Sequence, residues 1–194
     1  MTPLPFILFT LFSFLCGALP FSVWLSRRAG RDARDVGDHN PGATNALKAG
    51  GWAVGLLAFA LDISKGAFPV GLAWFVLGWR GWEIAPIALA PMFGHAFSPF
   101  LNFRGGKSLA VSLGIWIGLT LWRMPLFILP PLVLTFLFID NSGWAVSAAL
   151  LSLGVGVWLE GEPVLWAVYL PMAAFLLWKQ RAELRQPIQF RARR

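Results

Sequence analysis

The chain has 194 residues, of which 57% are hydrophobic and only 13% are charged. Because a soluble domain carries about 25% charged residues, this composition excludes an ordinary soluble protein and predicts an integral membrane protein. Most of the few charged residues are basic, which gives a net charge of +7. The one cysteine, Cys16, excludes a disulfide framework.

Seven apolar stretches along the chain are interpreted as membrane helices, because a helix needs about 20 apolar residues to cross the hydrocarbon core and roughly 17 suffice. The last four follow one another with very short breaks, which indicates antiparallel neighbours. We therefore predict an all-α membrane protein, a compact bundle of seven transmembrane helices forming one domain over residues 1–194. The predicted spans lie near 4–26, 51–79, 84–102, 108–122, 124–139, 144–159 and 163–178.

The positions of the cations predict the orientation of the bundle. With seven spans, 13 of the 16 Lys and Arg residues fall in loops on one side of the membrane, and the opposite loops contain only Arg80 and Arg123. Short cytoplasmic loops carry an excess of Lys and Arg. The N-terminus is therefore expected outside, and the basic loops and the C-terminus in the cytoplasm.

Two polar features lie within predicted spans. Asp62 and Lys65 are three residues apart, on one helical face, among apolar residues. Because a charge costs several kcal/mol in the middle of a membrane, the two are expected to pair, either to fix helix packing or to form the polar wall of a site. His95 is either a hydrogen-bonded core histidine or a support for a nearby site. No second His or Cys stands at ligand spacing, so no metal is predicted.

Two loops on the predicted cytoplasmic side have the character of anion sites. In Arg104-Gly105-Gly106-Lys107, adjacent glycines expose backbone N–H groups between two cations. Asn40 is predicted to cap a helix with Pro41 as its first residue. The next N–H groups, those of Gly42, Ala43 and Thr44, would then face an anion. The alternative is that both loops are only surface turns.

These segments together resemble the bacterial acyl-phosphate:glycerol-3-phosphate acyltransferases, the PlsY family. The family pattern Gly-Ser-Gly-Asn-x-Gly-Ala-Thr-Asn is matched by residues 37–45, and Gly-His-x-Phe-x-Pro-Phe-x-x-Phe-Lys-Gly-Gly-Lys-Gly by residues 94–108. Shorter matches are residues 17–21 at the end of the first span, Gly30, Asp32 and Arg34 after it, and Asp62, Lys65 and Gly66 in the second span.

The resemblance implies seven helices in the bacterial inner membrane, with cytoplasmic motifs that bind the phosphates of both substrates. It implies transfer of an acyl group from acyl phosphate to glycerol 3-phosphate, giving lysophosphatidic acid for phospholipid biosynthesis. Acyl phosphate is a mixed anhydride with a good leaving group, so positioning and charge stabilisation suffice and no protein nucleophile is required. The expected partners are these substrates and membrane lipid, with no cofactor and no nucleic acid.

The site residues that the resemblance implies come from three parts of the chain. The expected catalytic residues are Asn45, Lys107, Gln180 and Glu183. The expected substrate-binding residues are Asp38, Asn40, Gly42, Ala43, Thr44, Lys48, His95, Arg104, Gly105, Gly106 and Ser108.

Several of these positions depart from the family pattern. Asp38 replaces a Ser, and if the protein uses glycerol 3-phosphate, its negative charge must be neutralised by Lys48, Arg34 or another nearby cation, or its side chain must point away. The other departures are Lys48 for Arg, Arg104 for Lys, Ser108 for Gly, Gln180 for His and Glu183 for Asn. They leave open a paralogue with a changed acceptor or no catalysis that binds lipid or an anionic metabolite. A small transporter is a third reading, although the motifs gather on one membrane face whereas transport sites lie near the midplane.

Overall fold

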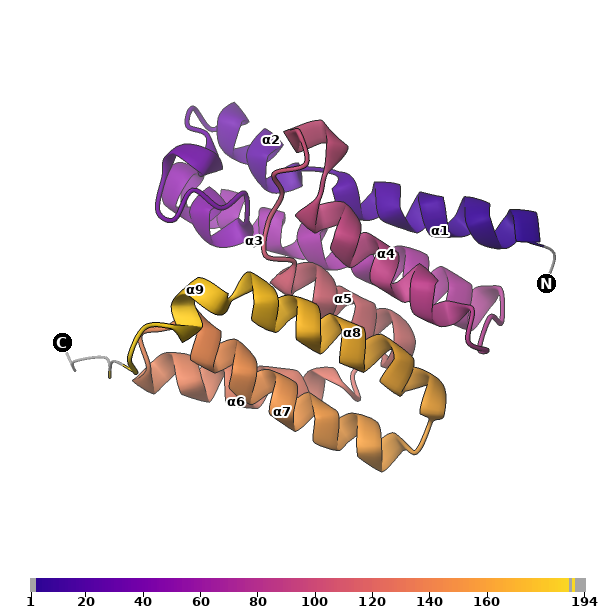
Figure 1. Ribbon diagram of the computed structural model, residues 1–194. Coiled ribbons are helices and arrows are strands. Elements are labelled where there is room, and N and C mark those ends of the chain that lie inside the picture. Colours follow the sequence, from indigo (N-terminus) through magenta and orange to yellow (C-terminus); the bar gives the residue numbers. More distant parts are fainter. Residues whose placement is uncertain (1–2, 189, 191–194) are drawn as a thin grey trace. The chain divides into compact units, whose positions relative to one another are not determined.

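The computed structural model describes residues 3–188 and residue 190, and the described chain is built from helices (Figure 1). Four helical segments in this part of the chain are long and apolar enough to cross a membrane, namely Pro3–Arg28, Ala43–Val76, Ile84–Leu101 and Ser142–Glu160. Three shorter apolar helices cover Leu109–Thr120, Pro125–Phe138 and Pro163–Lys179. The all-helical fold is confirmed for the described residues, and the count of seven spans remains a prediction.

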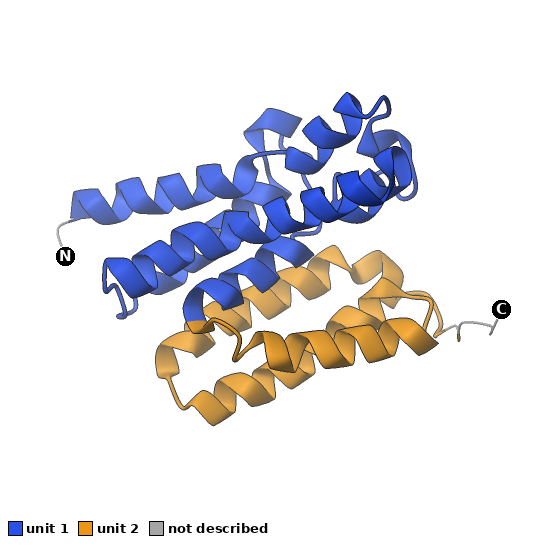
Figure 2. Ribbon diagram, turned by 180° about the vertical axis from the view of Figure 1, so that it is seen from behind, with its two compact units in different colours: residues 1–119 blue, residues 120–194 orange. Residues whose placement is uncertain are grey.

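The chain divides into two compact units, Met1–Leu119 and Thr120–Arg194, which Figure 2 shows in different colours. The first unit contains α1 (Pro3–Ala18), α2 (Phe21–Arg28), η1 (Ala33–Asp35), α3 (Ala43–Gly71), η2 (Leu72–Val76), α4 (Ile84–Ala96) and η3 (Pro99–Leu101). It also holds nearly all of α5 (Leu109–Thr120). The second contains α6 (Pro125–Phe138), α7 (Ser142–Glu160), α8 (Pro163–Lys179) and α9 (Arg181–Leu184). Arg191, Arg193 and Arg194, which contribute to the predicted orientation, lie outside the described residues.

The first predicted span is two helices, not one. We expected a continuous helix near 4–26, but α1 ends at Ala18 and α2 begins at Phe21. Pro20 stands between them with φ −90° and ψ 58°, and its carbonyl accepts hydrogen bonds from Val23 and Trp24. Since proline has no N–H to continue the first helix, it ends α1 and starts α2.

Helices α1 and α4 of the first unit pack backbone to backbone through glycine. A side chain at Gly17 would overlap the carbonyl of Pro91, and one at Gly94 would overlap the carbonyl of Phe14. Small residues allow such close approach between membrane helices, where packing and not the hydrophobic effect drives association. The end of α4, which precedes the glycine loop, is therefore held closely against α1.

The buried charges of the second predicted span form a pair. Lys65 Nζ lies 2.5 Å from Asp62 Oδ1, and both side chains are almost completely buried. Lys65 also lies over the ring of Phe21 from α2, 5.2 Å from its centroid. Gly66 packs against the backbone of α5 at Val111. This face of α3 is therefore in contact with α2 through Lys65 and Phe21 and with α5 through Gly66.

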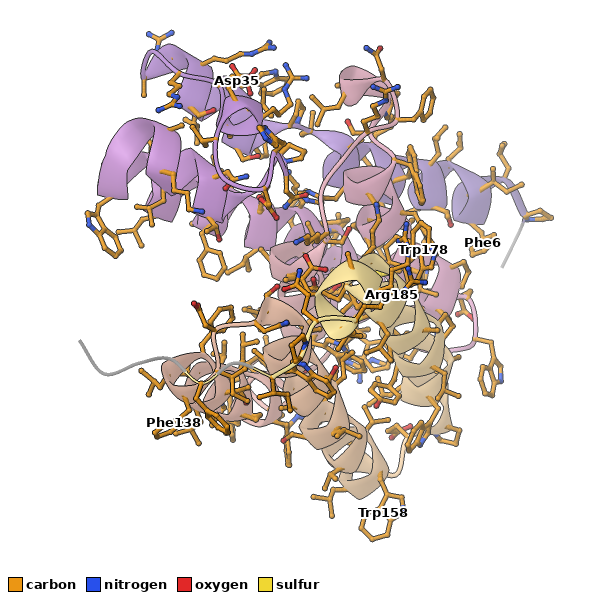
Figure 3. The ribbon with its side chains drawn as sticks, turned by 60° about the vertical axis from the view of Figure 1, so that its left-hand side comes forward. Phe6, Asp35, Phe138, Trp158, Trp178 and Arg185 are labelled. Carbon is orange, nitrogen blue, oxygen red and sulfur yellow. The ribbon has the colours of Figure 1, made fainter. Side chains whose placement is uncertain are left out.

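In the second unit, α7 begins where the sequence predicts a break. Asn141 caps α7 by accepting a hydrogen bond from the N–H of Gly143 at 2.8 Å, and its amide nitrogen donates to the carbonyl of Glu183 at 2.8 Å. Gly161 ends the helix in a left-handed conformation. Phe138 and Trp158, at the ends of α6 and α7, project outward in Figure 3 and are 60% and 70% exposed, as expected of side chains that meet lipid.

Candidate functional site

Two predicted site residues meet on one carboxylate in the first unit. Lys107 Nζ lies 2.9 Å from Asp38 Oδ2, and the side-chain amide of Asn45 donates to Asp38 Oδ1 at 2.8 Å. The same amide donates to the carbonyl of Asn40 at 2.9 Å. The loop before α3 and the glycine loop after η3, distant in sequence, are thereby joined.

The cation that neutralises Asp38 is Lys107. Arg34, one of the expected partners, pairs instead with Asp32 at 2.9 Å. Partial burial acts to raise the pKa of Asp38, but the hydrogen bonds from Lys107 and Asn45 and the charge of Lys107 outweigh it. The pKa of this carboxyl is therefore below its usual range, and Asp38 is ionised at neutral pH.

Lys48 also points toward this loop. A Cβ added to Gly37 would lie 2.9 Å from Lys48 Nζ and would overlap the side-chain oxygen of Asn45. Asn45 and Lys48 are three residues apart and so share one face of α3. Gly37 has φ +61° as well, so a larger residue there would be both strained and crowded.

The start of α3 differs from the prediction. Asn40 was expected to cap the helix, but α3 begins at Ala43 and its N-cap is Gly42. The reason is that Gly42 is extended (φ −138°, ψ 171°) and the carbonyl of Pro41 accepts a hydrogen bond from Ser22 of α2 at 3.1 Å. The first-turn N–H groups, which lack intrahelical acceptors, are therefore those of Ala43, Thr44 and Asn45.

The glycine loop does not present its backbone as expected. The N–H of Gly105 donates to the carbonyl of Ala96, and the N–H of Gly106 donates to the carbonyl of His95, both at 3.1 Å. The expectation that these two N–H groups are free for an anion is therefore wrong in this structure. The glycines are needed for another reason, since a Cβ on Gly106 would overlap the imidazole of His95 and one on Gly105 its carbonyl.

The loop consequently presents side chains on a backbone anchored to α4. Lys107 faces Asp38, and the buried Ser108 donates its hydroxyl to the carbonyl of Met92 at 2.8 Å. Arg104 is exposed. His95 is buried and contacts Gly106, in keeping with a supporting role.

The remaining two predicted catalytic residues belong to the second unit. Gln180 is fully buried at the end of α8, and neither atom of its side-chain amide has a hydrogen-bond partner among the described residues. An unpaired buried amide costs about 1–3 kcal/mol, so a ligand that paired with it would gain affinity. Glu183 lies on α9, whose position is fixed by the bond from Asn141.

Two serines that sequence reasoning missed hold this site in place. Ser22 binds the loop before α3, as described above, and the buried Ser98 donates to the carbonyl of Ala18 at 2.6 Å, which ties the segment after α4 to the end of α1. The only signal in the sequence is a hydroxyl close to a proline in an apolar stretch, since Ser22 follows Pro20 and Ser98 precedes Pro99.

Comparison with known proteins shows the family to which this chain belongs. The model of the family described as glycerol-3-phosphate acyltransferase matches residues 7–189. The chain belongs to the glycerol-3-phosphate acyltransferase family. It is 35% identical over 182 residues to a glycerol-3-phosphate acyltransferase of Thermus thermophilus, covering 91% of this chain and 88% of the relative. It is 43% identical over 129 residues to glycerol-3-phosphate acyltransferase 1 of Thermotoga maritima, covering 63% of this chain and 61% of the relative.

Solved structures of the family show the same fold. A crystal structure of PlsY (YgiH), an integral membrane glycerol 3-phosphate acyltransferase, in its glycerol 3-phosphate form has a TM-score of 0.86 and 28% identity. The match covers 93% of this chain and 90% of that chain. The form with lysophosphatidic acid gives a TM-score of 0.85 and 26% identity over the same shares. This protein is therefore an integral membrane protein of the glycerol-3-phosphate acyltransferase family.

Proposed function

We propose that the protein is a membrane acyltransferase that moves an acyl group from acyl phosphate to glycerol 3-phosphate and releases lysophosphatidic acid. The observation that carries the proposal is the meeting of Asn45 and Lys107 on one carboxylate, because it brings two predicted site residues from separate motifs to one place. Lys48 lies beside the same loop. Cations and amide donors are the groups that bind phosphate oxygens.

The proposed reaction needs little from the protein beyond positioning and charge. The acceptor hydroxyl attacks the acyl carbonyl carbon, the bond from that carbon to the phosphate oxygen breaks, and the phosphate leaves with the electron pair. The hydroxyl proton is carried away by the departing phosphate, so the atoms balance without a protein nucleophile. Lys107 stabilises phosphate charge, and Asn45 donates a hydrogen bond beside it.

The residues of the second unit extend this proposal. Gln180 supplies an unsatisfied buried amide, which suits a hydrogen bond to a polar ligand atom. We assign Glu183 to the same group because it lies on α9, the helix that follows Gln180. These roles, and those of Asn40, Gly42, Ala43, Thr44, Arg104 and Ser108, stay predictions.

The proposed topology has seven spans in a bacterial inner membrane, with the N-terminus outside. The three shorter helices have 12, 14 and 17 residues and, at 1.5 Å per residue, are about 18–26 Å long, so adjoining turns must complete each crossing. Replacing Cys16 and introducing single cysteines at Arg34 and Arg185 tests this topology. Both are expected to react with a membrane-impermeant thiol reagent only after the cells are opened.

The activity is tested with purified protein, acyl phosphate and radiolabelled glycerol 3-phosphate. Labelled lysophosphatidic acid is expected, and a Lys107→Ala variant is expected to lose most of it. Parallel reactions with acyl-CoA and acyl-carrier protein as donors decide the donor class. Product from either of these donors but not from acyl phosphate would contradict the proposed donor.

A second candidate function is favoured by Asp38, which places a negative charge at the family's Ser position. This function is acylation of an acceptor with a free hydroxyl and no phosphate. Labelled glycerol in place of glycerol 3-phosphate tests it in the same assay. Preferential acylation of glycerol would select this candidate.

A further inference from the structure

The carboxylate of Asp38 uses the donors that a substrate phosphate needs. One of its oxygens accepts from Lys107 Nζ at 2.9 Å and the other from Asn45 Nδ2 at 2.8 Å. The oxygens of carboxylates and of phosphates both accept hydrogen bonds from charged and amide donors. The family pattern has a neutral Ser at this position, and a neutral hydroxyl would not compete with phosphate as a carboxylate does.

We infer that Asp38 is an internal competitor for the phosphate site, a residue that sets how tightly the protein holds substrate and product phosphate. The inference rests on the proposed function, because it takes Lys107 as the phosphate-binding cation. A phosphate that binds Lys107 must first displace the Asp38 carboxylate. Asp38 therefore lowers the affinity for phosphate and favours release of the phosphate product.

The pair is weak enough to be displaced. The side chain of Asp38 is 54% exposed and that of Lys107 is 22% exposed. Exposed ion pairs of this kind change an equilibrium constant by less than about tenfold. A phosphate carries up to two negative charges, so it can compete with the single carboxylate of Asp38 in an ion pair of this strength.

Two contacts that do not involve Asp38 hold the loop when the carboxylate turns away. Asn45 also donates to the carbonyl of Asn40 at 2.9 Å, which closes the loop independently of Asp38. His39, the next residue, has φ +59° and its Nδ1 lies 2.8 Å from the carbonyl oxygen of Arg34, so the backbone beside Asp38 is fixed. Displacement therefore rotates one side chain and breaks the bonds of its carboxylate to Lys107, to Asn45 and, at 3.4 Å, to the N–H of Asn40.

Isothermal titration of the full-length protein in detergent with inorganic phosphate, at constant ionic strength balanced with chloride, tests the inference. Asp38→Asn is expected to bind phosphate about threefold to tenfold more tightly than the wild type. Asp38→Ser, which restores the family residue, is expected to do the same. Asp35→Asn removes an equal charge from an exposed position three residues away in the sequence (labelled in Figure 3) and is expected to leave the affinity within about twofold, because salt screens an exposed charge.

The Lys107→Ala background separates competition from general electrostatics. If Asp38 competes for Lys107, Asp38→Asn no longer increases the affinity when Lys107 is absent. Unchanged, weaker or unmeasurable phosphate binding by both Asp38 variants, shown by thermal unfolding to be folded, would overturn the inference. So would an equal gain in Asp35→Asn or in the Lys107→Ala background.

Acyl transfer by the same preparations distinguishes this result from the proposed function. Inactive wild-type protein whose Asp38 variants bind phosphate more tightly through Lys107 refutes the acyltransferase proposal and supports the internal competitor. Active wild-type protein without the gain refutes the competitor and leaves the acyltransferase proposal standing.

Discussion

The hydroxyl of Ser108 donates a hydrogen bond of 2.8 Å to the carbonyl of Met92, while the backbone of Ser108 is left-handed with φ +64°. The family pattern has Gly at this position, and glycine adopts this conformation without the steric cost of a Cβ, about 1–2 kcal/mol. The side-chain hydrogen bond partly offsets that cost in this chain. Ser108 thus adopts, with a Cβ, a backbone conformation that glycine takes at lower cost.

Two variants at this position are predicted to differ in stability. Ser108→Ala and Ser108→Gly both lose the hydroxyl, but only the alanine keeps a Cβ in the left-handed region. We expect Ser108→Gly to be the more stable by about 1 kcal/mol, measured as the free energy of unfolding in detergent. Equal stability of the two would show that the backbone at 108 relaxes freely.

Gly106→Ala is predicted to damage both stability and activity. The added methyl overlaps the imidazole of His95, and overpacking of this kind costs about 1–3 kcal/mol. Displacing His95 and the loop also moves Lys107, so acyl transfer should fall further than the loss of folded protein explains. Thermal unfolding and initial rates at equal folded concentration measure the two effects.

Gly71→Ala is the matched control. A Cβ there makes only an ordinary contact of 3.7 Å with Gly118, and alanine is favoured over glycine inside a helix by about 0.5–1 kcal/mol. Neutral or slightly increased stability is expected. A loss as large as that of Gly106→Ala would mean that any added methyl is harmful in this bundle.

Removing one partner of the Asp62–Lys65 pair is predicted to destabilise the protein strongly. Replacing both partners by apolar residues is predicted to cost little stability. Removing one partner leaves an unpaired buried charge, so Lys65→Met alone should lose about 3–5 kcal/mol. The double variant Asp62→Leu with Lys65→Met should recover most of that loss, because both charges leave the membrane interior. Unfolding of the three proteins under the same conditions measures the difference. A double variant that folds well but transfers no acyl group would assign the pair to the site.

Asp32 is predicted to make stability depend on pH in the acid range. The guanidinium of Arg34 holds the pKa of the Asp32 carboxyl well below its usual value, and Arg27 adds a bond at 2.7 Å. A lowered pKa in the folded state means that the stabilisation is complete above about pH 5. This stabilisation is lost as the pH falls below the usual pKa of a carboxyl, about 4, toward the lower pKa that Asp32 has in the folded state. Asp32→Asn should therefore lower the unfolding temperature at pH 7, and the difference from the wild type should shrink at pH 3.

The long apolar runs and the breaks between them were predictable because a membrane leaves an apolar run of this length few alternatives to a helix. The breaks at Asn141 and Gly161 follow from local capping chemistry, which the sequence displays. The division at Pro20 was missed because the run from 4 to 26 is apolar throughout, and hydropathy alone does not register a missing N–H.

The interior of the site was less predictable because its contacts join distant segments. Nothing near Asp38 identifies Lys107 as its partner, and Lys48 and Arg34 are closer in sequence. The use of the Gly105 and Gly106 N–H groups by the carbonyls of α4 likewise depends on where the chain folds back. A glycine pair between cations fits an anion cradle and a tightly packed turn equally well.

Within α3, Gly51 is not helical and has φ +81° and ψ −178°. A straight helix over the 29 residues of α3 would be about 44 Å long, well beyond the roughly 30 Å of hydrocarbon in a bilayer. The part of α3 after Gly51, residues 52–71, has a length of about 30 Å, and η2 continues it to Val76, so this part crosses the bilayer without the residues before Gly51. The break thus removes a hydrophobic mismatch that would tilt the helix or deform the lipid. The depth of Asn45 and Lys48 relative to the lipid headgroups is consequently determined by the torsion angles of one glycine.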